Sequence, residues 1–289
     1  MYVKNDRREA SWHVARLDYA RWHVSAYCVV ADFEDIVYIW EADDRIVAAL
    51  IGDGWPGDAH PCVDPTTASE SLIAEMIEVG ESELSDAKPG QATRMTFRSL
   101  DSDQERSRAL EARGYTKGSA FYQWRRILDA KPSPPELPDG YRIAPVGEGL
   151  RLLERCYASG LAFHDNKISQ AVENRDEFEW YLNIQGALLY RRDLDLTVVA
   201  PSGEVAAFST VWFDDVTRSG YFEPVATVPA HRKKGLAKAV MVEGLRVLHT
   251  LGATVAHVHG GNDAANSLYR SVMGPDYDVY SKWTREWSG

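Results

Sequence analysis

YFEPVATVPAHRKKGLA, residues 221–237, is the stretch from which the prediction of the fold starts. Its first part, Tyr221 to Val228, is rich in β-branched and aromatic residues, which is typical of a strand. From Leu236 to Leu251, apolar residues then recur at the spacing of an amphipathic helix. We therefore predict a strand that passes into a helix through a short basic turn.

This turn has the composition of an anion site. A helix that starts near Leu236 leaves its first N–H groups without partners inside the helix, and its dipole places positive charge at the same end. Such an end suits a phosphate group. Gly235 lets the backbone approach a ligand because it has no Cβ, and Arg232, Lys233 and Lys234 add positive charge. For the two lysines, a simple solvated surface is an equally open interpretation.

The pattern Arg232-x-x-Gly235-x-Ala237 resembles the acetyl-CoA pyrophosphate loop of the GCN5-related N-acetyltransferases, the GNAT superfamily. The signature of that loop is Arg or Gln-x-x-Gly-x-Gly or Ala. A second strand expected at 254–259 and the run from Asn262 to Tyr269 follow in the order that the family has. The resemblance implies an α/β fold with a mixed central sheet flanked by helices, and acetyl-CoA as co-substrate.

Composition restricts the class of protein. The chain has 289 residues, 45% hydrophobic and 26% charged, which suffices for one large or two ordinary soluble domains. The net charge of −11 argues against general nucleic-acid binding and is compatible with a cationic substrate such as an amine. Widely spaced Cys28, Cys62 and Cys156 favour a reducing compartment over a disulfide framework or a zinc site. Without a recognisable signal peptide or membrane span, we expect a cytoplasmic protein. Without a metal-ligand spacing, we also expect no metal.

A proline-rich run divides the sequence. Residues 129–140 contain four prolines, which exclude a helix or central strand and predict a stiff linker. Before the linker, we expect helices at 10–30, 69–84 and 103–113, strands at 36–40, 45–52, 92–97 and from 121, and a loop with at most a short strand at 52–65. After it, we expect strands at 141–146, 196–200, 205–213, 221–228 and 254–259, and helices at 148–159, 176–190, 236–251 and from 262.

The similar order on both sides predicts two tandem GNAT-like domains, residues 1–128 and 141–289, an arrangement similar to that of mycothiol synthases. When Val63-Asp64-Pro65 is laid on Thr227-Val228-Pro229, the loop is missing from the first copy: Arg232 meets Ala68, Gly235 meets Ser71, Ala237 meets Ile73 and Tyr269 meets Glu111. Glu70 and Glu75 would also repel a phosphate. We therefore expect the first copy to be degenerate, with a structural role or a role in the substrate cleft.

The resemblance assigns three residues to the chemistry. Acetyl transfer from a thioester to an amine needs a neutral amine, a polarised carbonyl and a protonated leaving thiolate. Glu223 is expected to take the amine proton, the N–H of Val225 to face the thioester oxygen, and Tyr269 to protonate the sulfur. Pro224 has no N–H, which fits an interrupted strand pairing. A solvent-exposed glutamate, a plain central strand and a core tyrosine are the alternatives.

The same resemblance implies the remaining contacts. Val225, Ala226, Thr227 and Val228 would line the pantetheine arm, and further cofactor contacts would come from Arg232, Lys233, Lys234, Gly235, Leu236, Ala237, Asn262, Asn266 and Tyr269. Asn262 is also explained as a helix N-cap. His164 and Asp165, which follow Phe163, and Trp180 and Tyr181 are candidates for the substrate wall. His257 and His259 share one face of a strand, but nothing nearby in the sequence completes a metal site.

These expectations lead to an N-acetyltransferase whose C-terminal domain moves an acetyl group from acetyl-CoA directly to a primary amine of a small molecule. The chain has no Gly-x-Ser-x-Gly motif, which agrees with direct transfer. The alternatives are an acetyltransferase of the mycothiol-synthase type and a non-catalytic module that binds or senses acyl-CoA.

Overall fold

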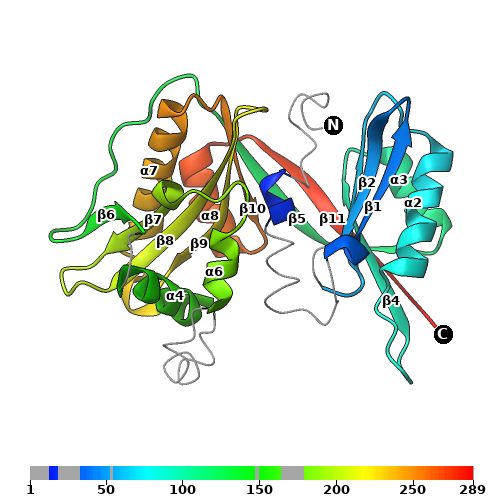
Figure 1. Ribbon diagram of the computed structural model, residues 1–289, viewed down its shortest axis with the longest axis horizontal. Coiled ribbons are helices and arrows are strands. Elements are labelled where there is room, and N and C mark those ends of the chain that lie inside the picture. The colour runs from blue at the N-terminus through cyan, green and yellow to red at the C-terminus, as the bar shows by residue number, and fades with distance from the viewer. Residues whose placement is uncertain (1–12, 19–32, 53–54, 147–149, 164–178, 289) are drawn as a thin grey trace. The chain divides into compact units, whose positions relative to one another are not determined.

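The computed structural model describes residues 13–18, 33–52, 55–146, 150–163 and 179–288. Contacts divide the chain into two compact units (Figure 1). The first unit combines Met1–Gln123 with Tyr277–Gly289, and the second is Trp124–Asp276. Within the described residues, no helix has the length and apolar character needed to cross a membrane. Each unit is a mixed sheet with helices packed on it, so the predicted α/β fold with a mixed sheet flanked by helices is confirmed.

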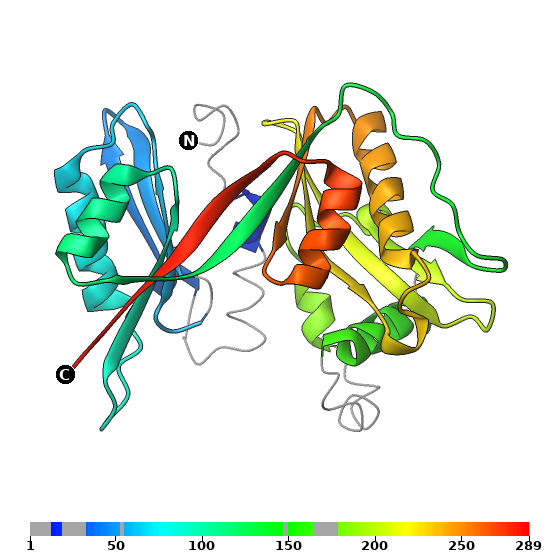
Figure 2. The same cartoon turned by 180° about the vertical axis from the view of Figure 1, so that it is seen from behind.

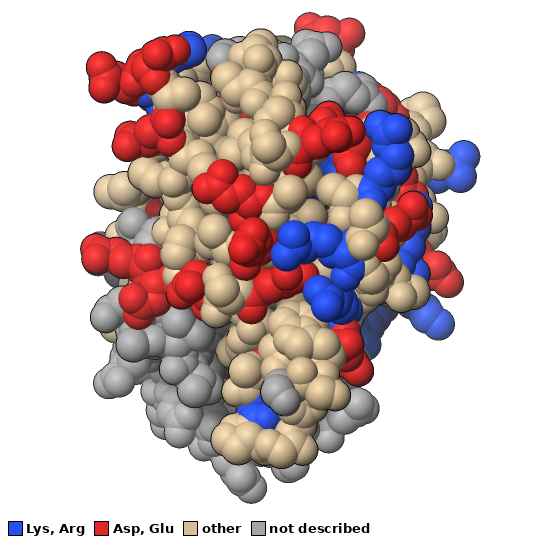
Figure 3. Space-filling view, turned by 90° about the vertical axis from the view of Figure 1, so that its right-hand side faces the viewer, with Lys and Arg blue, Asp and Glu red and all other residues tan. Residues whose placement is uncertain are grey.

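The first unit has the strand order β1-β2-β3-β4-β11-β5. Its elements are η1 (Phe33–Ile36), β1 (Val37–Ala42), β2 (Arg45–Gly52), β3 (Asp58–Val63), α2 (Glu70–Glu83), β4 (Thr93–Leu100), α3 (Gln104–Ala112), β5 (Thr116–Ile127) and β11 (Tyr277–Trp287). Apolar residues of α2, α3 and the strands form one core, to which Leu50, Met76, Phe97 and Trp283 contribute. Figure 3 shows acidic and basic side chains interspersed on the side of the molecule that carries this unit.

Local sequence explains most of these elements. Asp43 and Asp44 adopt positive φ angles of 51° and 57°, as the two central residues of a tight hairpin turn require. The side chain of Ser69 accepts a hydrogen bond from the N–H of Leu72 and starts α2, and Asp103 starts α3 in the same way. The predicted hairpin and both helices are therefore present. The range 52–65, expected as loop with at most a short strand, contains β3.

The last strand of the C-terminal half lies in the first unit, and the last strand of the N-terminal half ends in the second unit. β11 pairs antiparallel with β4 in the first unit, from Tyr280 opposite Leu100 to Trp287 opposite Thr93. The end of β5, from Trp124 onward, belongs to the second unit and lies beside β10. Figure 2 shows β5 and β11 as two long neighbouring strands. This grouping differs from the predicted domains 1–128 and 141–289, which kept each last strand with its own half.

The second unit continues the order from β10 through β9, β8 and β7 to β6. Its elements are β6 (Arg142–Pro145), α4 (Leu150–Phe163), α6 (Glu179–Gln185), η3 (Arg192–Leu194), β7 (Asp195–Val199), β8 (Val205–Asp214), β9 (Ser219–Thr227), η4 (Pro229–His231), α7 (Leu236–Thr250), β10 (Val255–Gly260) and α8 (Asp263–Met273). Residues 129–140 form no helix or strand, as the prolines predict.

Helices cover both faces of this second sheet. α7 packs on one face, where Gly244 lies against Phe222 and Val211. An added Cβ at Gly244 would lie 2.6 Å from the ring of Phe222, so the helix can approach this closely only with glycine there. α4 packs on the other face, where Arg155 lies over the ring of Phe208. β9, between these layers, carries Glu223 and Val225, two of the three residues predicted to act in catalysis.

Candidate acyl-transfer site

β9 separates from its parallel neighbour halfway along its length. The pairing of β9 with β10 runs from Ser219 opposite Val255 to Phe222 opposite Val258 and ends there. On its other side, β9 stays paired with β8 as far as Thr227 opposite Ala207. The residues before the separation are buried and 223–227 are half-buried. The strand therefore opens on one side, as the family resemblance implied.

A bulge marks the point of separation. Phe222 pairs with Val211 and Val225 with Ser209, so a single residue of β8 faces the two residues Glu223 and Pro224. The indole N–H of Trp212 donates to the carbonyl oxygen of Glu223 at 2.6 Å. Because Pro224 has no N–H, the bulge leaves no unpaired backbone donor at this residue.

The N–H of Val225 points into the opened side. In an antiparallel pair, alternate residues direct their N–H and C=O groups toward the partner strand. Val228 donates to the carbonyl oxygen of Ala206 on the β8 side at 2.9 Å, so Thr227 and Val225 direct theirs away from β8. In agreement, the carbonyl oxygen of Thr227 accepts from Nε of Arg232 at 3.3 Å. The backbone donor predicted to meet a thioester oxygen thus faces the gap between β9 and β10.

Glu223 and Tyr269 lie at the same opening. The hydroxyl of Tyr221 donates to Oε2 of Glu223 at 3.1 Å. Tyr269, from α8, is 7% exposed, and its ring approaches Gly260 at the end of β10. Burial and, secondly, the negative charge of Glu223 raise the pKa of Tyr269 above its ordinary value. Tyr269 is therefore protonated at neutral pH beside a carboxylate, an arrangement that supplies both a proton donor and a proton acceptor.

The turn before α7 has an open N-terminus. Gly235, the N-cap, has a φ of 76°, and Lys233 has a φ of 61°. Both angles lie in the left-handed region, which glycine adopts most readily. Residues 232–235 are exposed, and an added Cβ at Gly235 would meet no atom of the described residues within 4 Å. As the N-cap residue has no side chain, the first N–H groups of α7 face this open space.

Two of the predicted cations also hold the turn in place. Arg232 donates to the carbonyl oxygen of Thr227 and, at 3.4 Å, to that of Ala162 at the end of α4. Nζ of Lys234 lies 3.0 Å from the hydroxyl of Tyr141. That hydroxyl also lies 3.0 Å from Nδ1 of His231. Arg232 and Lys234 therefore connect the turn to α4 and to the end of the proline-rich segment.

The other residues predicted to contact the cofactor lie at α8 and at the start of α7. Asn262 is the N-cap of α8, because its Oδ1 accepts from the N–H of Ala265 at 2.9 Å. Oδ1 of Asn266 accepts from the indole of Trp124 at 3.0 Å, so this oxygen already has a partner. Leu236 is buried and Ala237 half-buried at the start of α7. Among the described residues, no three histidine, cysteine or acidic side chains gather as metal ligands.

The candidate substrate wall is only partly described. His164, Asp165 and the side chain of Trp180 lie outside the described residues. Phe163 is 54% exposed at the end of α4. Tyr181 was expected in the wall, but its side chain is buried and its hydroxyl donates to Oδ2 of Asp195. That expectation was wrong because the Tyr181 hydroxyl binds the buried carboxylate of Asp195, which the sequence pattern did not reveal.

This carboxylate belongs to a buried cluster that the sequence analysis missed. Nε of Arg155, from α4, lies 3.3 Å from Oδ1 of Asp195 on β7, and both side chains are fully buried. Thr210 of β8 donates to the same oxygen at 3.0 Å, and Tyr190 donates to Oδ2 at 2.9 Å. Thr210 is the β8 residue that faces the bulge at Glu223, so the cluster connects α4 and α6 to the strand beside the site.

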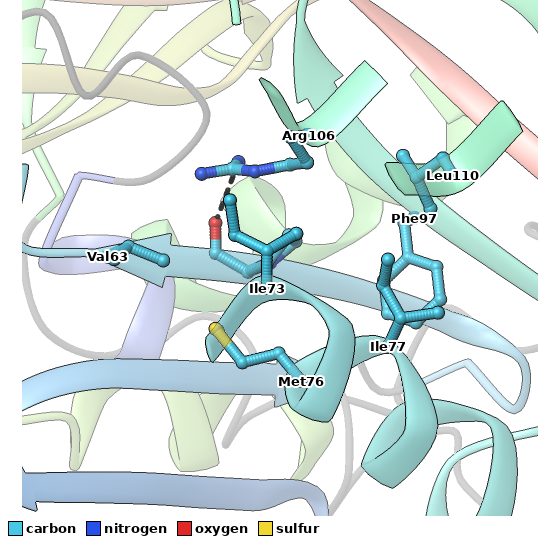
Figure 4. A pocket seen from close by; sticks show the side chains of 8 residues that line it. Val63, Ile73, Met76, Ile77, Phe97, Arg106 and Leu110 are labelled. Atoms are coloured by element: carbon cyan, nitrogen blue, oxygen red, sulfur yellow. Dashed lines mark hydrogen bonds between the residues drawn. The ribbon is translucent and has the colours of Figure 1, made fainter. Parts of the chain in front are cut away.

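The equivalent place in the first unit is filled (Figure 4). β3 pairs with β4 only at Asp58 and Ala59, so these strands separate as well. Arg106 of α3, 5% exposed, donates from Nη1 to the carbonyl oxygen of Pro61 at 3.1 Å and binds Asp103. A cavity of about 10 Å³ remains beside it, which is about the space of one water molecule. In the overlay, Pro61 also falls on Val225 and offers no N–H.

Comparisons with known proteins agree with this geometry. Residues 154–274 match the model of the acetyltransferase (GNAT) family. A GCN5-related N-acetyltransferase from Sphaerobacter thermophilus has 19% sequence identity and a TM-score of 0.63, over 90% of this chain and 84% of that one. A tandem GNAT protein from the clavulanic acid biosynthesis pathway has 14% identity and a TM-score of 0.59, over 88% and 83%. A GCN5-related N-acetyltransferase from Kribbella flavida has 14% identity and a TM-score of 0.58, over 97% of both chains.

No curated protein matches the sequence of the chain. The family model and the opened strand lie in the same segment, and the structural likeness extends over both units. Residues 154–274 of the second unit therefore match the GNAT family, and the fold of the chain is similar to that of tandem GNAT proteins.

Proposed function

We propose that the protein is an N-acetyltransferase whose second unit transfers an acetyl group from acetyl-CoA to a primary amine of a small molecule. One observation carries the proposal. The opened side of β9 carries the N–H of Val225 and the carboxylate of Glu223, the charge of Glu223 acts on the buried hydroxyl of Tyr269, and the uncapped N-terminus of α7 follows a few residues later. An acyl donor with a pyrophosphate needs an oxyanion donor at its thioester and an anion site at its pyrophosphate.

The chemistry follows from these groups. Glu223, directly or through a water molecule, takes one proton from the substrate ammonium, so that the nitrogen can attack the thioester carbon. The N–H of Val225 stabilises the negative oxygen of the tetrahedral intermediate. When the carbon–sulfur bond breaks, Tyr269 donates its proton to the leaving thiolate. The proton that Glu223 took then returns to Tyr269 and the second amine proton passes to solvent, so that an amide and a free thiol are formed without a covalent enzyme intermediate.

Charge supports an amine as acceptor. The net charge of −11 attracts a cation from solution, and Glu223 offers a carboxylate at the site. A hydrogen bond from Tyr221 holds Oε2 of that carboxylate, so the orientation of the base is set before substrate binds. The first unit, in which Arg106 fills the equivalent place, would contribute structure and not a second donor site.

Calorimetric titration with acetyl-CoA, followed by measurement of CoA release with a panel of small amines, tests the proposal. We expect one site per chain and turnover with at least one amine. Glu223→Gln and Tyr269→Phe should keep the affinity for acetyl-CoA and lose turnover. If acetyl-CoA binds but neither variant changes turnover, the assigned roles are wrong. Binding without turnover for any amine would favour the acyl-CoA-sensing module.

A further inference from the structure

Tyr190, which lies between α6 and η3, has contacts at both ends of its side chain. Its hydroxyl donates to Oδ2 of Asp195 at 2.9 Å and accepts from Nε2 of Gln185 at 3.1 Å. Its ring packs edge to face against the ring of Trp212, with the centroids 6.3 Å apart and an angle of 71° between the planes. Tyr190 therefore connects a buried carboxylate to the aromatic side chain that binds the backbone of β9.

The hydroxyl end is held by a carboxylate that has little freedom to move. Asp195 is fully buried, and its Oδ1 is held by Arg155 from α4 and by Thr210 from β8. Burial and, secondly, the negative charge of Asp195 raise the pKa of Tyr190, so its hydroxyl keeps its proton and donates at neutral pH. A hydrogen bond to a charged acceptor is shorter and stronger than one between neutral groups. The position of Tyr190 is thus set by the interior of the second unit.

The ring end reaches the acyl-transfer site through Trp212. The indole has one N–H, which donates to the carbonyl oxygen of Glu223 at 2.6 Å. Because this N–H lies in the plane of the ring, a rotation of the side chain moves it away from the carbonyl oxygen. Edge-to-face packing is an arrangement that aromatic rings prefer, and here it opposes such a rotation. Tyr190 therefore acts on the backbone at Glu223 through Trp212.

We propose that Tyr190 is a positioning residue of the acyl-transfer site. Anchored on Asp195, it fixes the indole of Trp212. The indole in turn fixes the bulge that carries Glu223 and that directs the N–H of Val225. The inference rests on the proposed function and extends it to the segment between α6 and β7. This segment affects the rate of acetyl transfer more than the affinity for the acyl donor, because the contacts of Tyr190 lead to the bulge.

Tyr181 provides a matched control. Its hydroxyl donates to the same Oδ2 of Asp195, so Tyr181→Phe and Tyr190→Phe each remove one donor from this oxygen. The ring of Tyr181 lies against the guanidinium group of Arg155, whose Cζ is 5.0 Å from the ring centroid. Both variants should therefore lose stability in urea unfolding, but only Tyr190→Phe releases a ring that packs on Trp212.

Steady-state kinetics of the full chain, with acetyl-CoA and the amine of the panel that is turned over fastest, tests the proposal. Tyr190→Phe should lower kcat by roughly tenfold, because a small misplacement of the reacting groups slows the reaction strongly. Calorimetry should show an unchanged affinity for acetyl-CoA. Tyr181→Phe should keep the kcat of the unaltered protein. Equal losses of kcat in the two variants, or no loss in Tyr190→Phe, would overturn the proposal.

A double-variant cycle separates positioning from a general loss of stability. Trp212→Phe has no indole N–H to position, so Tyr190→Phe should cause little further loss of kcat in that background. Effects that multiply would show that Tyr190 does not act through Trp212, and they would overturn the proposal. If the unaltered protein binds acetyl-CoA but turns over no amine, the proposed function itself fails. That outcome is distinct from a Tyr190→Phe variant that keeps full activity.

Discussion

The indole N–H of Trp212 donates to the carbonyl oxygen of Glu223 at 2.6 Å, from β8 to the bulge of β9. This bond holds the backbone at the point where β9 leaves β10, one residue before Pro224 and two before Val225. The side chain of Trp212 is almost fully buried, and the hydrogen bond that it donates is partly buried. The positions of Glu223, the candidate base, and Val225, the candidate oxyanion donor, therefore depend on Trp212, a residue with no direct part in the proposed reaction.

We predict that Trp212→Phe lowers kcat/KM by roughly tenfold or more, because the partly buried carbonyl of Glu223 loses its donor, which costs up to about 1–3 kcal/mol, and the bulge shifts to recover part of that cost. Steady-state kinetics with the identified amine would measure the loss. Trp283→Phe, at a buried position in the first unit, is the control and should reduce stability without reducing kcat/KM. Equal activity of both variants would contradict the positioning role of Trp212.

Glu223→Gln should lower the pKa of Tyr269. Burial and the charge of Glu223 both disfavour the phenolate and raise this pKa, so removal of the charge leaves burial alone. Ultraviolet titration of phenolate absorbance would show the change when Glu223→Gln is compared with the double variant that also carries Tyr269→Phe. An onset of Tyr269 ionisation at the same pH with and without Glu223 would refute the coupling.

Gly235→Ala should weaken the binding of acetyl-CoA by roughly tenfold or more. The added Cβ would point into the open space in front of α7, where the pyrophosphate is proposed to lie. Gly90→Ala is a matched control, because Gly90 has a φ of 75° against 76° for Gly235 and its added Cβ also meets nothing within 4 Å among the described residues. Both variants should lose about 1 kcal/mol of stability from backbone strain. Calorimetry should show weaker binding only for Gly235→Ala.

Arg106→Ala should destabilise the protein by about 2–4 kcal/mol. The variant leaves the carbonyl oxygen of Pro61 without its donor and opens a cavity beneath α3. Arg108→Ala, on the exposed side of the same helix, should change stability by less than about 0.5 kcal/mol. Urea unfolding would compare them. A gain of a second acetyl-CoA site in Arg106→Ala would show that the arginine, and not the lost anion loop, prevents binding in the first unit.

Arg155→Met should cost about 3–5 kcal/mol, because it leaves the fully buried carboxylate of Asp195 without its cation. Arg155→Met/Asp195→Asn should recover a large part of the loss, since no unpaired charge then remains. Arg191→Met breaks an ion pair whose side chains are 40% and 59% exposed and should cost less than about 1 kcal/mol. A similar cost for Arg155→Met and Arg191→Met would contradict the importance of the buried pair.

Features that depend on near neighbours in sequence could be predicted. Ser69 and Asp103 start helices because their side chains reach the N–H groups three residues on, and the turn before α7 was found from the spacing of Arg232 and Gly235. Nothing in a strand's own pattern says which sheet it joins, so the placement of β11 beside β4 was not foreseen. Arg155 and Asp195 lie 40 residues apart and carry no spacing signal.

The positions of Arg106 and Tyr181 differ in how far the sequence could have predicted them. Arg106 precedes the apolar Leu110 by one helical turn, so its place on the buried face of α3 was open to prediction. Tyr181 was expected in a substrate wall, but a tyrosine on a helix packs equally well against a buried acceptor, and only the fold decides between these positions. The roles of Glu223, Val225 and Tyr269 stay predictions that the proposed kinetics will test.

The pairing of β4 with β11 determines when the first unit can be completed during synthesis. A ribosome that has finished β4 must add residues 101–276 before the first residue of β11 appears, about 9–35 seconds at 5–20 residues per second. Throughout that interval the nascent chain presents an unsatisfied strand edge, which invites contact with chaperones or with other chains. The first sheet can thus close only after β11 has been synthesised, and a chain that stops before β11 keeps the open edge of β4.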